Sequence, residues 1–278
     1  DLRRSIPYMF LHLGCLAVFW VGWSPFAVGV AIALYFIRMF AVTAFYHRYF
    51  AHRAFKTSRF MQFVFGVMGN LSMQRGPLWG AATHRHHHRH SDEPEDKHSP
   101  VQSGFWWAHF GWLTSASNFP TDYSKIGDLT KFPELMFLNR RCMVVPFLYG
   151  ALLWLSGEAL GRWAPSLGVS GAQLFVWGFF ISTVVLLHGT LLVNSLAHTF
   201  GRRRFDTSDD SRNSLLIALV TLGEGWHNNH HRFASSARQG FYWWEIDVSY
   251  YILRLLSWIG LIWDLRPVPK RVYDDVDA

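Results

Sequence analysis

Four apolar stretches, each close to the length that crosses a bilayer, constrain this chain more than any other feature. They are Ile6–Val21, Pro25–Tyr46, Cys142–Leu155 and Leu174–Leu196. A helix needs about 20 mostly apolar residues to cross the hydrocarbon core. Because lipid offers no hydrogen bonds to the backbone, a spanning segment must satisfy its own, as a helix does. We therefore predict an all-α integral membrane protein with transmembrane helices at about 6–23, 25–46, 142–157 and 174–196.

The composition supports this class. The 278 residues are 50% hydrophobic and include 14 Trp and 24 Phe, enough for one large domain, which we place at 1–278. The net charge is +7, but Lys and Arg stand in short clusters beside apolar runs, as in membrane-flanking segments rather than nucleic-acid grooves. The 2 cysteines, Cys15 and Cys142, lie in or beside apolar runs and indicate neither a disulfide framework nor a cysteine zinc site.

The distribution of charge predicts the topology. Arg3 and Arg4, the segment 47–141 and the chain after His198 are strongly charged, whereas the connectors after the first and third stretches carry no net charge. Positive residues favour the cytoplasmic side. We expect two transmembrane hairpins, both termini in the cytoplasm, and a cytosolic helical cap formed by 47–141 and 198–278.

Three segments of this cap have recognisable character. Thr57–Ser72 alternates polar and apolar residues at helical spacing but is too short to span, which predicts an interfacial helix; a core helix is the alternative. The charged segment His90–Pro100 reads as a surface loop. The acidic end, Asp274–Ala278, is expected to be disordered.

Most of the 15 histidines fall into tight groups. His47 and His52 stand where the second stretch meets the cytoplasm. Five residues of α-helix turn through about 140°, so this pair could share a metal only if the helix ended between them. Two histidines at a membrane boundary are otherwise unremarkable interfacial residues.

Two further groups repeat one spacing. His84, His87 and His88 stand at i, i+3 and i+4, and so do His227, His230 and His231. Three residues so spaced lie on one helical face. Stacked imidazoles gain little from one another unless a cation accepts their lone pairs. A surface polyhistidine tract is the alternative for His84–His90, although the second copy has no such excess of histidine.

A fourth feature, Asn194 and His198, lies at the cytoplasmic end of the fourth stretch. The two are four residues apart, so on a helix they share a face and can address one metal. His188, ten residues before His198, would lie about 15 Å deeper in the span. His86 points off the face shared by His84 and His87. We therefore expect His188 and His86 not to be ligands.

The predicted topology brings all four features to one membrane face. So many histidines without cysteine exceed one closed tetrahedral site and indicate two metals with open positions. Imidazole suits iron, copper or zinc, so ligand type does not choose the metal. Asp92, Glu93 and Glu224 could accept the second N–H of ligand imidazoles, although solvated loop carboxylates are the alternative for Asp92 and Glu93.

The same segments, in order over about residues 25–245, resemble the membrane acyl-CoA desaturases of the stearoyl-CoA, delta-9 type, in a short form like the bacterial branch. They are His47–His52, His84–His88, Asn194–His198 and Gly223–His231. The segment from Gly127 to Arg140 also looks like the family's loop before the third transmembrane helix. The chain departs from the animal enzymes at Thr83, where they usually have an acidic residue, and at the extra imidazole of His86.

The resemblance implies a desaturase that uses dioxygen and two Fe ions to put a cis double bond into a fatty acyl chain, as acyl-CoA or another acyl lipid. It also implies a separate electron donor, a ferredoxin or a cytochrome b5-like protein, and allows zinc to replace iron. By this resemblance the metal ligands are His47, His52, His84, His87, His88, His198, His227, His230 and His231, with Asn194 acting through water and no other catalytic residue.

An acyl chain would need an apolar tunnel, for which we predict Phe36, Phe40, Val185 and Leu192 of the second and fourth spans. The alternative enzyme is a histidine-box hydroxylase or monooxygenase of a lipid, alkane or sterol. A metal transporter would need an ionisable pathway through the spans. They contain Arg38, His12 and His188, which indicate no such path.

Overall fold

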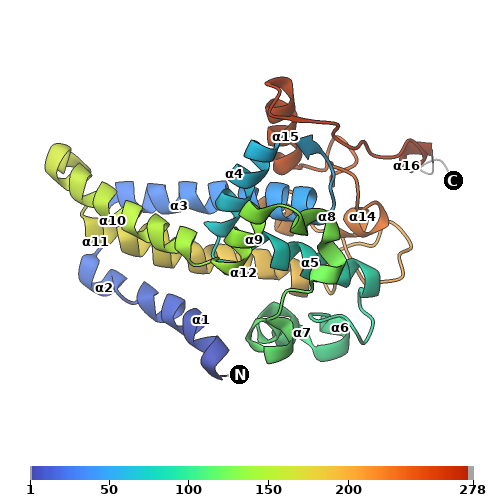
Figure 1. Ribbon diagram of the computed structural model, residues 1–278, viewed down its shortest axis with the longest axis horizontal. Helices are drawn as coiled ribbons and strands as arrows, with labels where there is room; N and C mark the ends of the chain where they lie inside the picture. The colour runs from blue at the N-terminus through green and yellow to red at the C-terminus, as the bar shows by residue number, and fades with distance from the viewer. Residues whose placement is uncertain (1, 275–278) are drawn as a thin grey trace.

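The computed structural model describes residues 2–274 and is predominantly helical, which confirms the predicted all-α class (Figure 1). Four helices are long and apolar enough to cross a membrane: Arg3–Val21, Pro25–Ala51, Val144–Trp163 and Gly171–Ser195. Each overlaps one predicted span. The third extends beyond the predicted end at 157 because Glu158 and Arg162 continue the helix instead of ending it.

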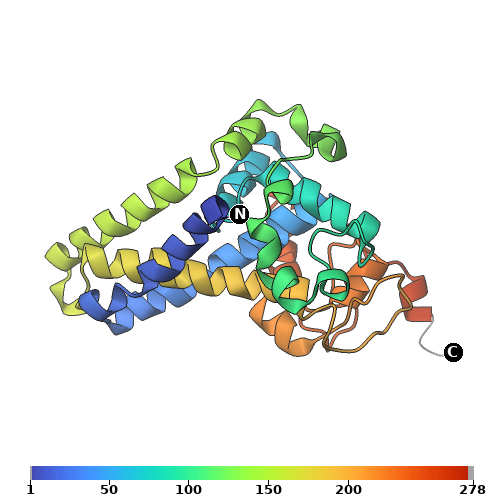
Figure 2. The same ribbon diagram turned by 90° about the horizontal axis from the view of Figure 1, so that it is seen from below.

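These spans are built from eight elements. They are α1 (Leu2–Cys15) and α2 (Val18–Val21), α3 (Pro25–Phe40) and the π-helical η1 (Ala41–Ala51), α10 (Val144–Trp163), and α11 (Gly171–Phe175), which continues through the π-helical η6 (Val176–Ile181) into α12 (Ser182–Ser195). Figures 1 and 2 show the long helices gathered on one side of the molecule. Their burial differs: in the most apolar window, 56% of the fourth helix but only 6% of the first is buried. Helix α1 is therefore peripheral.

Glycines allow two of the close approaches between these helices. A Cβ on Gly157 of α10 would lie 2.7 Å from the Cα of Gly171 in α11, and a Cβ on Gly14 of α1 would lie 2.3 Å from the ring of Phe180. Small residues at such crossings let membrane helices approach closely enough for van der Waals packing.

Except for η5, which joins α10 to α11 within the group of long helices, the remaining elements form the other side of the molecule. They are β1 (Lys56–Thr57), α4 (Arg59–Asn70), α5 (Pro77–His90), α6 (Pro100–Ser103), α7 (Phe105–His109), η2 (Gly111–Thr114), η3 (Ala116–Asn118), η4 (Tyr123–Ile126), α8 (Gly127–Thr130), α9 (Pro133–Arg140), η5 (Pro165–Leu167, between α10 and α11), α13 (Leu215–Val220), α14 (His227–Arg232), α15 (Val248–Trp258), β2 (Ile262–Trp263) and α16 (Arg271–Asp274). Strands β1 and β2 pair antiparallel, with Lys56 opposite Trp263.

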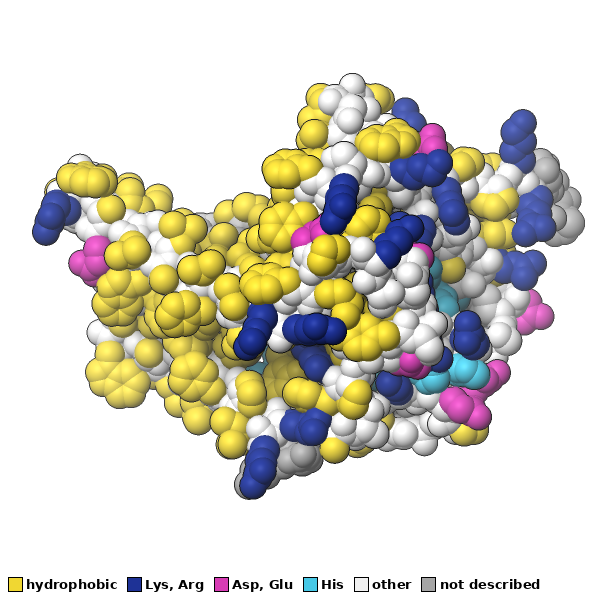
Figure 3. All heavy atoms as spheres, in the orientation of Figure 1, with side chains coloured by type: hydrophobic (Ala, Val, Ile, Leu, Met, Phe, Trp, Pro, Cys, Tyr) yellow, Lys and Arg dark blue, Asp and Glu magenta, His cyan; other side chains and the backbone are white. Residues whose placement is uncertain are grey.

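The surface separates along the same line. In Figure 3 hydrophobic side chains dominate the part over the long helices, whereas most Lys, Arg, Asp, Glu and His side chains gather over the shorter elements. A continuous apolar surface of this kind needs a nonaqueous environment. This agrees with a membrane protein. Of the predicted acidic tail Asp274–Ala278, residues 275–278 lie outside the described part of the chain.

Helix α4 covers most of the predicted interfacial segment, but its faces are inverted relative to a helix on a water-soluble core. Gln62 and Asn70 are buried, and Gln62 accepts a hydrogen bond of 2.8 Å from the Tyr49 hydroxyl. Phe60 and Phe63 are exposed. Gln62 and Asn70 therefore bind the protein together with the buried Phe65, while Phe60 and Phe63 point outward, as expected for a helix resting against lipid.

One charged side chain lies deep among the spans. Arg38 of α3 is buried, and its guanidinium donates to Thr183 Oγ1 (2.6 Å), Ser182 Oγ (2.7 Å) and the Leu71 carbonyl (3.3 Å). The guanidinium also lies 5.2 Å from the ring centroid of Tyr149. Arg38 thus ties α3 to α12 and to the end of α4, so its charge is accounted for by a fixed polar network rather than an ion path.

We predict that Arg38→Ala destabilises the protein, because it removes several charge-assisted hydrogen bonds and leaves the buried hydroxyls without their donor. The expected loss is about 2 kcal/mol or more. The midpoint of thermal unfolding in detergent measures it. Arg254→Ala, on the exposed face of α15, is the matched control and should change little. An Arg38→Ala midpoint equal to that of the control would contradict this account.

Candidate metal centre

Nine histidines gather in two adjacent clusters. The five-histidine cluster contains His47, His52, His84, His88 and His230, and the four-histidine cluster contains His87, His198, His227 and His231; within each, one ligand atom from every residue lies within 4.8 Å of the others. These nine are the histidines assigned as ligands from the sequence. The structure brings them together from four separate parts of the chain.

A widened helical turn brings His47 and His52 together. The sequence predicted that they could share a site only if the helix ended between them. The helix does end between them: it passes His47 as the π-helical η1 and ends at Ala51, and the His52 amide donates to the His47 carbonyl at 3.2 Å. Because a π-helix bonds residue i to residue i+5, residues five apart stack along the axis. Their ring centroids lie 4.9 Å apart.

The two repeated histidine groups, His84–His88 on α5 and His227–His231 on α14, are called boxes below. Each box contributes histidines to both clusters. On α5, His84 and His88 join the five-histidine cluster while His87 joins the other; on α14, His227 and His231 join the four-histidine cluster while His230 crosses over. The sequence placed the three histidines of each group on one helical face and left their division between the two metals open. Each box keeps its i, i+4 pair in one cluster and gives its i+3 residue to the other.

The region around Asn194 also differs from expectation. Helix α12 ends at Ser195, so His198 lies in the following turn and does not share a helical face with Asn194. His198 nevertheless reaches the four-histidine cluster, with its Nε2 3.0 Å from His227 Nε2. Asn194 lines the cavity beside the clusters. The turn, rather than the helix, positions His198.

Four of the imidazoles bind a carboxylate through the ring nitrogen that faces away from the cluster. Nδ1 of His198 lies 2.8 Å from Asp92, Nδ1 of His87 lies 2.9 Å from Asp96, and Nδ1 of His231 lies 2.7 Å from Asp209. In the five-histidine cluster, His47 Nδ1 pairs with Glu224. Because a carboxylate accepts the Nδ1 proton, Nε2 keeps its lone pair and faces inward. Sequence reasoning anticipated Asp92 and Glu224. Glu93 instead binds His90, outside both clusters.

Asp96 and Asp209 were missed. Asp96 belongs to the segment predicted as a surface loop, but it is buried, and its second oxygen accepts from His98 Nδ1 at 2.9 Å. His98 is buried too, with its ring 4.8 Å from that of Trp112. The segment is therefore irregular but partly internal. No spacing rule links Asp96 or Asp209 to a histidine, since each contact forms across a turn or between distant segments.

Further buried polar side chains bind the carboxylate Glu224 and the helix α14 that carry or position the histidines. Arg48, with 1% of its surface exposed, donates to Glu224 (3.0 Å) and to Asp247 (3.0 Å). The two asparagines between the histidines of the last box anchor α14. Asn228 accepts from the Phe205 amide (2.7 Å), and Asn229 donates to the Gln239 carbonyl (2.9 Å). The asparagines thus orient the helix, which explains their place in the motif.

The environment lowers the pKa of seven of the clustered imidazoles and so favours their neutral form. Burial, reinforced by neighbouring histidines, lowers the pKa of His52, His84, His88, His227, His230 and His231 well below the usual value. Burial lowers the pKa of His87 to about 4. For Asp96, burial alone would raise the pKa, but hydrogen bonds from His87 and His98 lower it. Neutral imidazoles beside ionised carboxylates are the state in which histidine binds metals.

The donor set fits metal ions. His230 Nε2 lies 3.0 Å from His47 Nε2 and 2.8 Å from His88 Nε2, and His84 Nε2 lies 2.7 Å from His52 Nε2. His231 Nε2 is buried without any hydrogen-bond partner among the described residues. Lone pairs that converge in this way repel unless a cation accepts them. Two clusters of nitrogen ligands without thiolate fit iron or zinc.

The two competing histidines lie elsewhere. His86 belongs to neither cluster, and its Nε2 contacts the Glu95 carbonyl at 2.9 Å. His188 also belongs to neither and contacts His12 and His109. That neither residue is a metal ligand stays a prediction.

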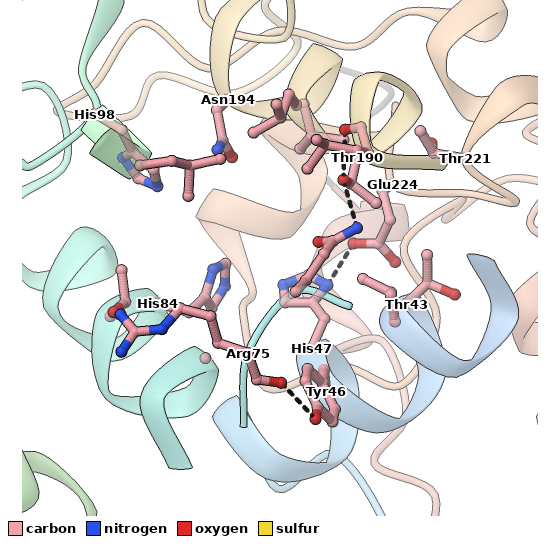
Figure 4. Close-up of a pocket in the computed structure, with 18 of the residues that line it drawn as sticks. Thr43, Tyr46, His47, Arg75, His84, His98, Thr190, Asn194, Thr221 and Glu224 are labelled. Atoms are coloured by element: carbon pink, nitrogen blue, oxygen red, sulfur yellow. Dashed lines mark hydrogen bonds and ion pairs between the residues drawn. The ribbon is translucent and has the colours of Figure 1, made fainter. Parts of the chain in front are cut away.

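A cavity adjoins the clusters. Its lining includes His47, His84 and Asn194, which lie in or beside the histidine clusters. It also includes Met39 of the second span and Leu187 and Leu191 of the fourth. Figure 4 shows His98 and Asn194 on one side of this cavity and Tyr46 and His47 on the opposite side.

The predicted tunnel residues do not line this cavity. Phe36 and Val185 are exposed on the outer surface of the spans, and Phe40 packs against Phe45. Leu192, like the other three, is absent from the cavity lining, which uses Leu191 instead. Other residues of the same two spans line it, because an apolar helix gives no sequence signal of which face turns inward. That an acyl tunnel follows these spans stays a prediction.

Comparison with known proteins gives a consistent result. The fatty acid desaturase family model matches residues 21–264. An acyl-CoA 5-desaturase of Anemone leveillei is 38% identical over 98% of this chain and 81% of its own length. An sn-1 stearoyl-lipid 9-desaturase of Anabaena variabilis is 37% identical over 96% of the chain and 94% of its own length. A hex-5-enoyl-[acyl-carrier protein] acetylenase of Moorena producens is 35% identical over 98% and 87%.

We predict about two metal ions per chain in protein produced with added iron, one for each cluster. Replacing His230 or His198 by Ala should remove about one of them, because the two belong to different clusters. Elemental analysis of purified protein measures the ratio. His86→Ala and His188→Ala are the controls and should retain both ions. A single tightly bound zinc in every preparation would contradict the two-site arrangement.

Asp209→Asn should weaken metal binding selectively. It exchanges the carboxylate that holds His231 Nδ1 for a neutral amide of the same shape, and loss of such a support lowers metal affinity by roughly 10–100-fold. Competition with a chelator measures the change, with Glu93→Gln as the matched surface control. Because His231 belongs to the four-histidine cluster, only one of two ions should become easier to remove. Equal loss of both ions, or of neither, would count against this assignment.

Proposed function

The chain belongs to the fatty acid desaturase family, and we propose that it introduces a cis double bond into a saturated fatty acyl chain at two iron ions bound by nine histidines. The members of this family are oxidoreductases, and the relatives compared above are named for forming unsaturated acyl chains. The observation that carries the proposal is the pair of histidine clusters, rich in nitrogen and free of thiolate, beside an apolar cavity between the second and fourth spans.

The reaction removes two hydrogen atoms from neighbouring carbons of the acyl chain. Dioxygen accepts these two hydrogens together with two electrons and two protons, and two water molecules leave. Iron ions bound in the clusters would supply the activation of dioxygen that no amino-acid side chain can provide.

The protein's own residues then have three roles. The histidine Nε2 atoms would hold the ions, and Asn194 would reach one of them through water. Asp92, Asp96, Asp209 and Glu224 fix the tautomers of their histidines through the contacts described above. Met39, Leu187 and Leu191 offer an apolar wall that would hold the acyl chain straight and exclude water from the reacting carbons.

We propose acyl-CoA as the substrate form, with an acyl lipid as the other candidate. The relatives named above act on acyl-CoA, on a stearoyl lipid and on an acyl-carrier protein, so the acyl chain is what they share. The electrons would come from a separate ferredoxin or cytochrome b5-like protein. Zinc is the ion expected to replace iron when iron is scarce, because it binds nitrogen ligands more tightly than ferrous iron.

We also propose that residues 1–278 form one desaturase domain with two transmembrane hairpins and with the metal centre and both termini on the cytoplasmic side. The support is the charge distribution: Arg140, Arg141 and the run Arg202–Arg204 flank the ends of the spans nearest the histidines. The substrate headgroup would then remain in the cytoplasm while the acyl chain enters the membrane.

Expression in a host that lacks its own desaturase should produce monounsaturated fatty acids, detected by gas chromatography with mass spectrometry. His198→Ala should abolish the product by removing a ligand, and His86→Ala should retain it. Hydroxylated fatty acids in place of unsaturated ones would identify the enzyme as a monooxygenase instead. The absence of any new product in iron-replete cells that contain a compatible ferredoxin would contradict the proposal.

A further inference from the structure

Three histidines outside the metal centre form a separate hydrogen-bonded chain. His188 of α12 lies between the other two: its Nε2 is 3.0 Å from His12 Nε2 of α1, and its Nδ1 is 3.0 Å from His109 Nε2 of α7. At the ends, His12 Nδ1 lies 2.7 Å from the Tyr8 carbonyl and His109 Nδ1 lies 2.9 Å from Ser195 Oγ. We call these three residues the histidine chain.

The geometry of the chain is not that of a metal site. His188 uses both ring nitrogens for two different neighbours, so the three rings do not direct lone pairs to one point. The nine histidines of the metal centre, by contrast, converge within each cluster. The histidine chain is an extended line that joins three helices.

Hydrogen-bond chemistry constrains the two ends of the histidine chain. The Tyr8 carbonyl can only accept, so His12 Nδ1 donates to it. The Ser195 hydroxyl donates its one proton to the Leu191 carbonyl at 2.9 Å, so its oxygen accepts from His109 Nδ1. His188 lies between these two ends, with one ring nitrogen 3.0 Å from each neighbouring imidazole. Such partners matter in apolar surroundings, where unpaired polar groups are costly.

The histidine chain attaches α1, the least buried of the long helices, to α12 and α7. Only 6% of the most apolar window of the first helix is buried. Besides the histidine chain, α1 is held by Gly14 packed against Phe180, by the edge contact of Tyr8 with Phe110, and by Arg4, which donates to the Ala116 carbonyl at 3.3 Å. His12 supplies a side-chain hydrogen bond from α1 to α12, and His109 continues it to α7. Loss of this bond would weaken the attachment of α1 to α12.

The residues beside the histidine chain form one wall of the cavity. Trp112, Leu113, Leu187 and Leu191 make a single apolar cluster against which Tyr8 packs, and all five line the cavity. These residues are close in sequence to members of the histidine chain. Tyr8 is near His12, Leu187 is near His188, and Trp112 is near His109. The position of this wall therefore depends on the contact between α1, α7 and α12.

We propose that His12, His188 and His109 are positioning residues that hold α1 against α7 and α12 and thereby set the width of the acyl cavity and the chain lengths it accepts. This inference rests on the proposed function, because it takes a fatty acyl chain as the ligand of the cavity. None of the three residues contacts the clustered nitrogens. Breaking the chain should change acyl selectivity while leaving the metal centre intact.

Two substitutions at one position test the proposal. His188→Gln keeps one donor and one acceptor on a planar amide and should preserve both contacts. His188→Leu fills similar space but leaves His12 and His109 without partners. His12→Leu, which breaks only the outer contact, is a milder variant in case His188→Leu fails to fold. Metal content shows whether each variant is folded, and it should match that of the unchanged protein in all three.

The first measurement follows α1 directly. Cys15 is a free, half-buried thiol one turn beyond His12, so its rate of labelling by a maleimide reports the attachment of the helix. Cys142→Ser removes the only other thiol. We expect labelling to accelerate roughly fivefold or more in His188→Leu, the factor that corresponds to about one lost hydrogen bond, and to stay unchanged in His188→Gln.

The second measurement follows selectivity without turnover. Equilibrium binding of myristoyl-, palmitoyl- and stearoyl-CoA should show a preference that is lost or shifted severalfold in His188→Leu and kept in His188→Gln. Unchanged labelling and unchanged preference in His188→Leu would overturn the proposal, as would a His188→Gln variant that behaves like His188→Leu. Because neither measurement uses desaturation, a protein that binds acyl chains selectively but forms no double bond would contradict the proposed reaction and leave the histidine chain supported.

Discussion

The convergence of imidazole lone pairs is the constraint on which the rest of the structure depends. Nine histidines point nitrogen atoms at one another across contacts as short as 2.7 Å, an arrangement that is unfavourable without a cation. Three carboxylates in the four-histidine cluster and one in the other hold the opposite ring nitrogens. Arg48, Asn228 and Asn229 hold the supporting elements in turn. The shorter helices and the segments that connect them carry most of these histidines, carboxylates and supporting residues and so enclose the metal centre.

The exchange of histidines between the two boxes links the two halves of this centre. If each box served one metal, α5 and α14 could separate with their sites intact. Because His87 and His230 cross to the opposite clusters, neither cluster is complete without both helices. The π-helical η1 adds His47 from the end of the second span, so the membrane helices and the cap are joined through the same site. Because η1 joins the second span to the clusters, the cavity between the second and fourth spans lies directly beside the clustered histidines.

The sequence predicted the parts of this arrangement that depend on local pattern. Apolar length located four spans, and the spacing of His84–His88 and of His227–His231 identified the boxes, because both signals repeat within one or two helical turns. It did not predict the π-helical turn at His47, the end of α12 before His198, or the division of each box between clusters, which tertiary packing decides. Asp96, Asp209 and the histidine chain were missed because their partners meet only in the fold, and the inward faces of the spans carry no pattern that distinguishes Leu191 from Leu192.

The central claim is that the two clusters hold two separate metal ions. Anomalous diffraction from crystals of iron-loaded protein, measured on both sides of the iron absorption edge, tests it most directly. The account predicts two iron peaks, one among the Nε2 atoms of His47, His52, His84, His88 and His230, the other among those of His87, His198, His227 and His231. A single peak shared by both clusters, or peaks away from these nitrogens, would contradict it.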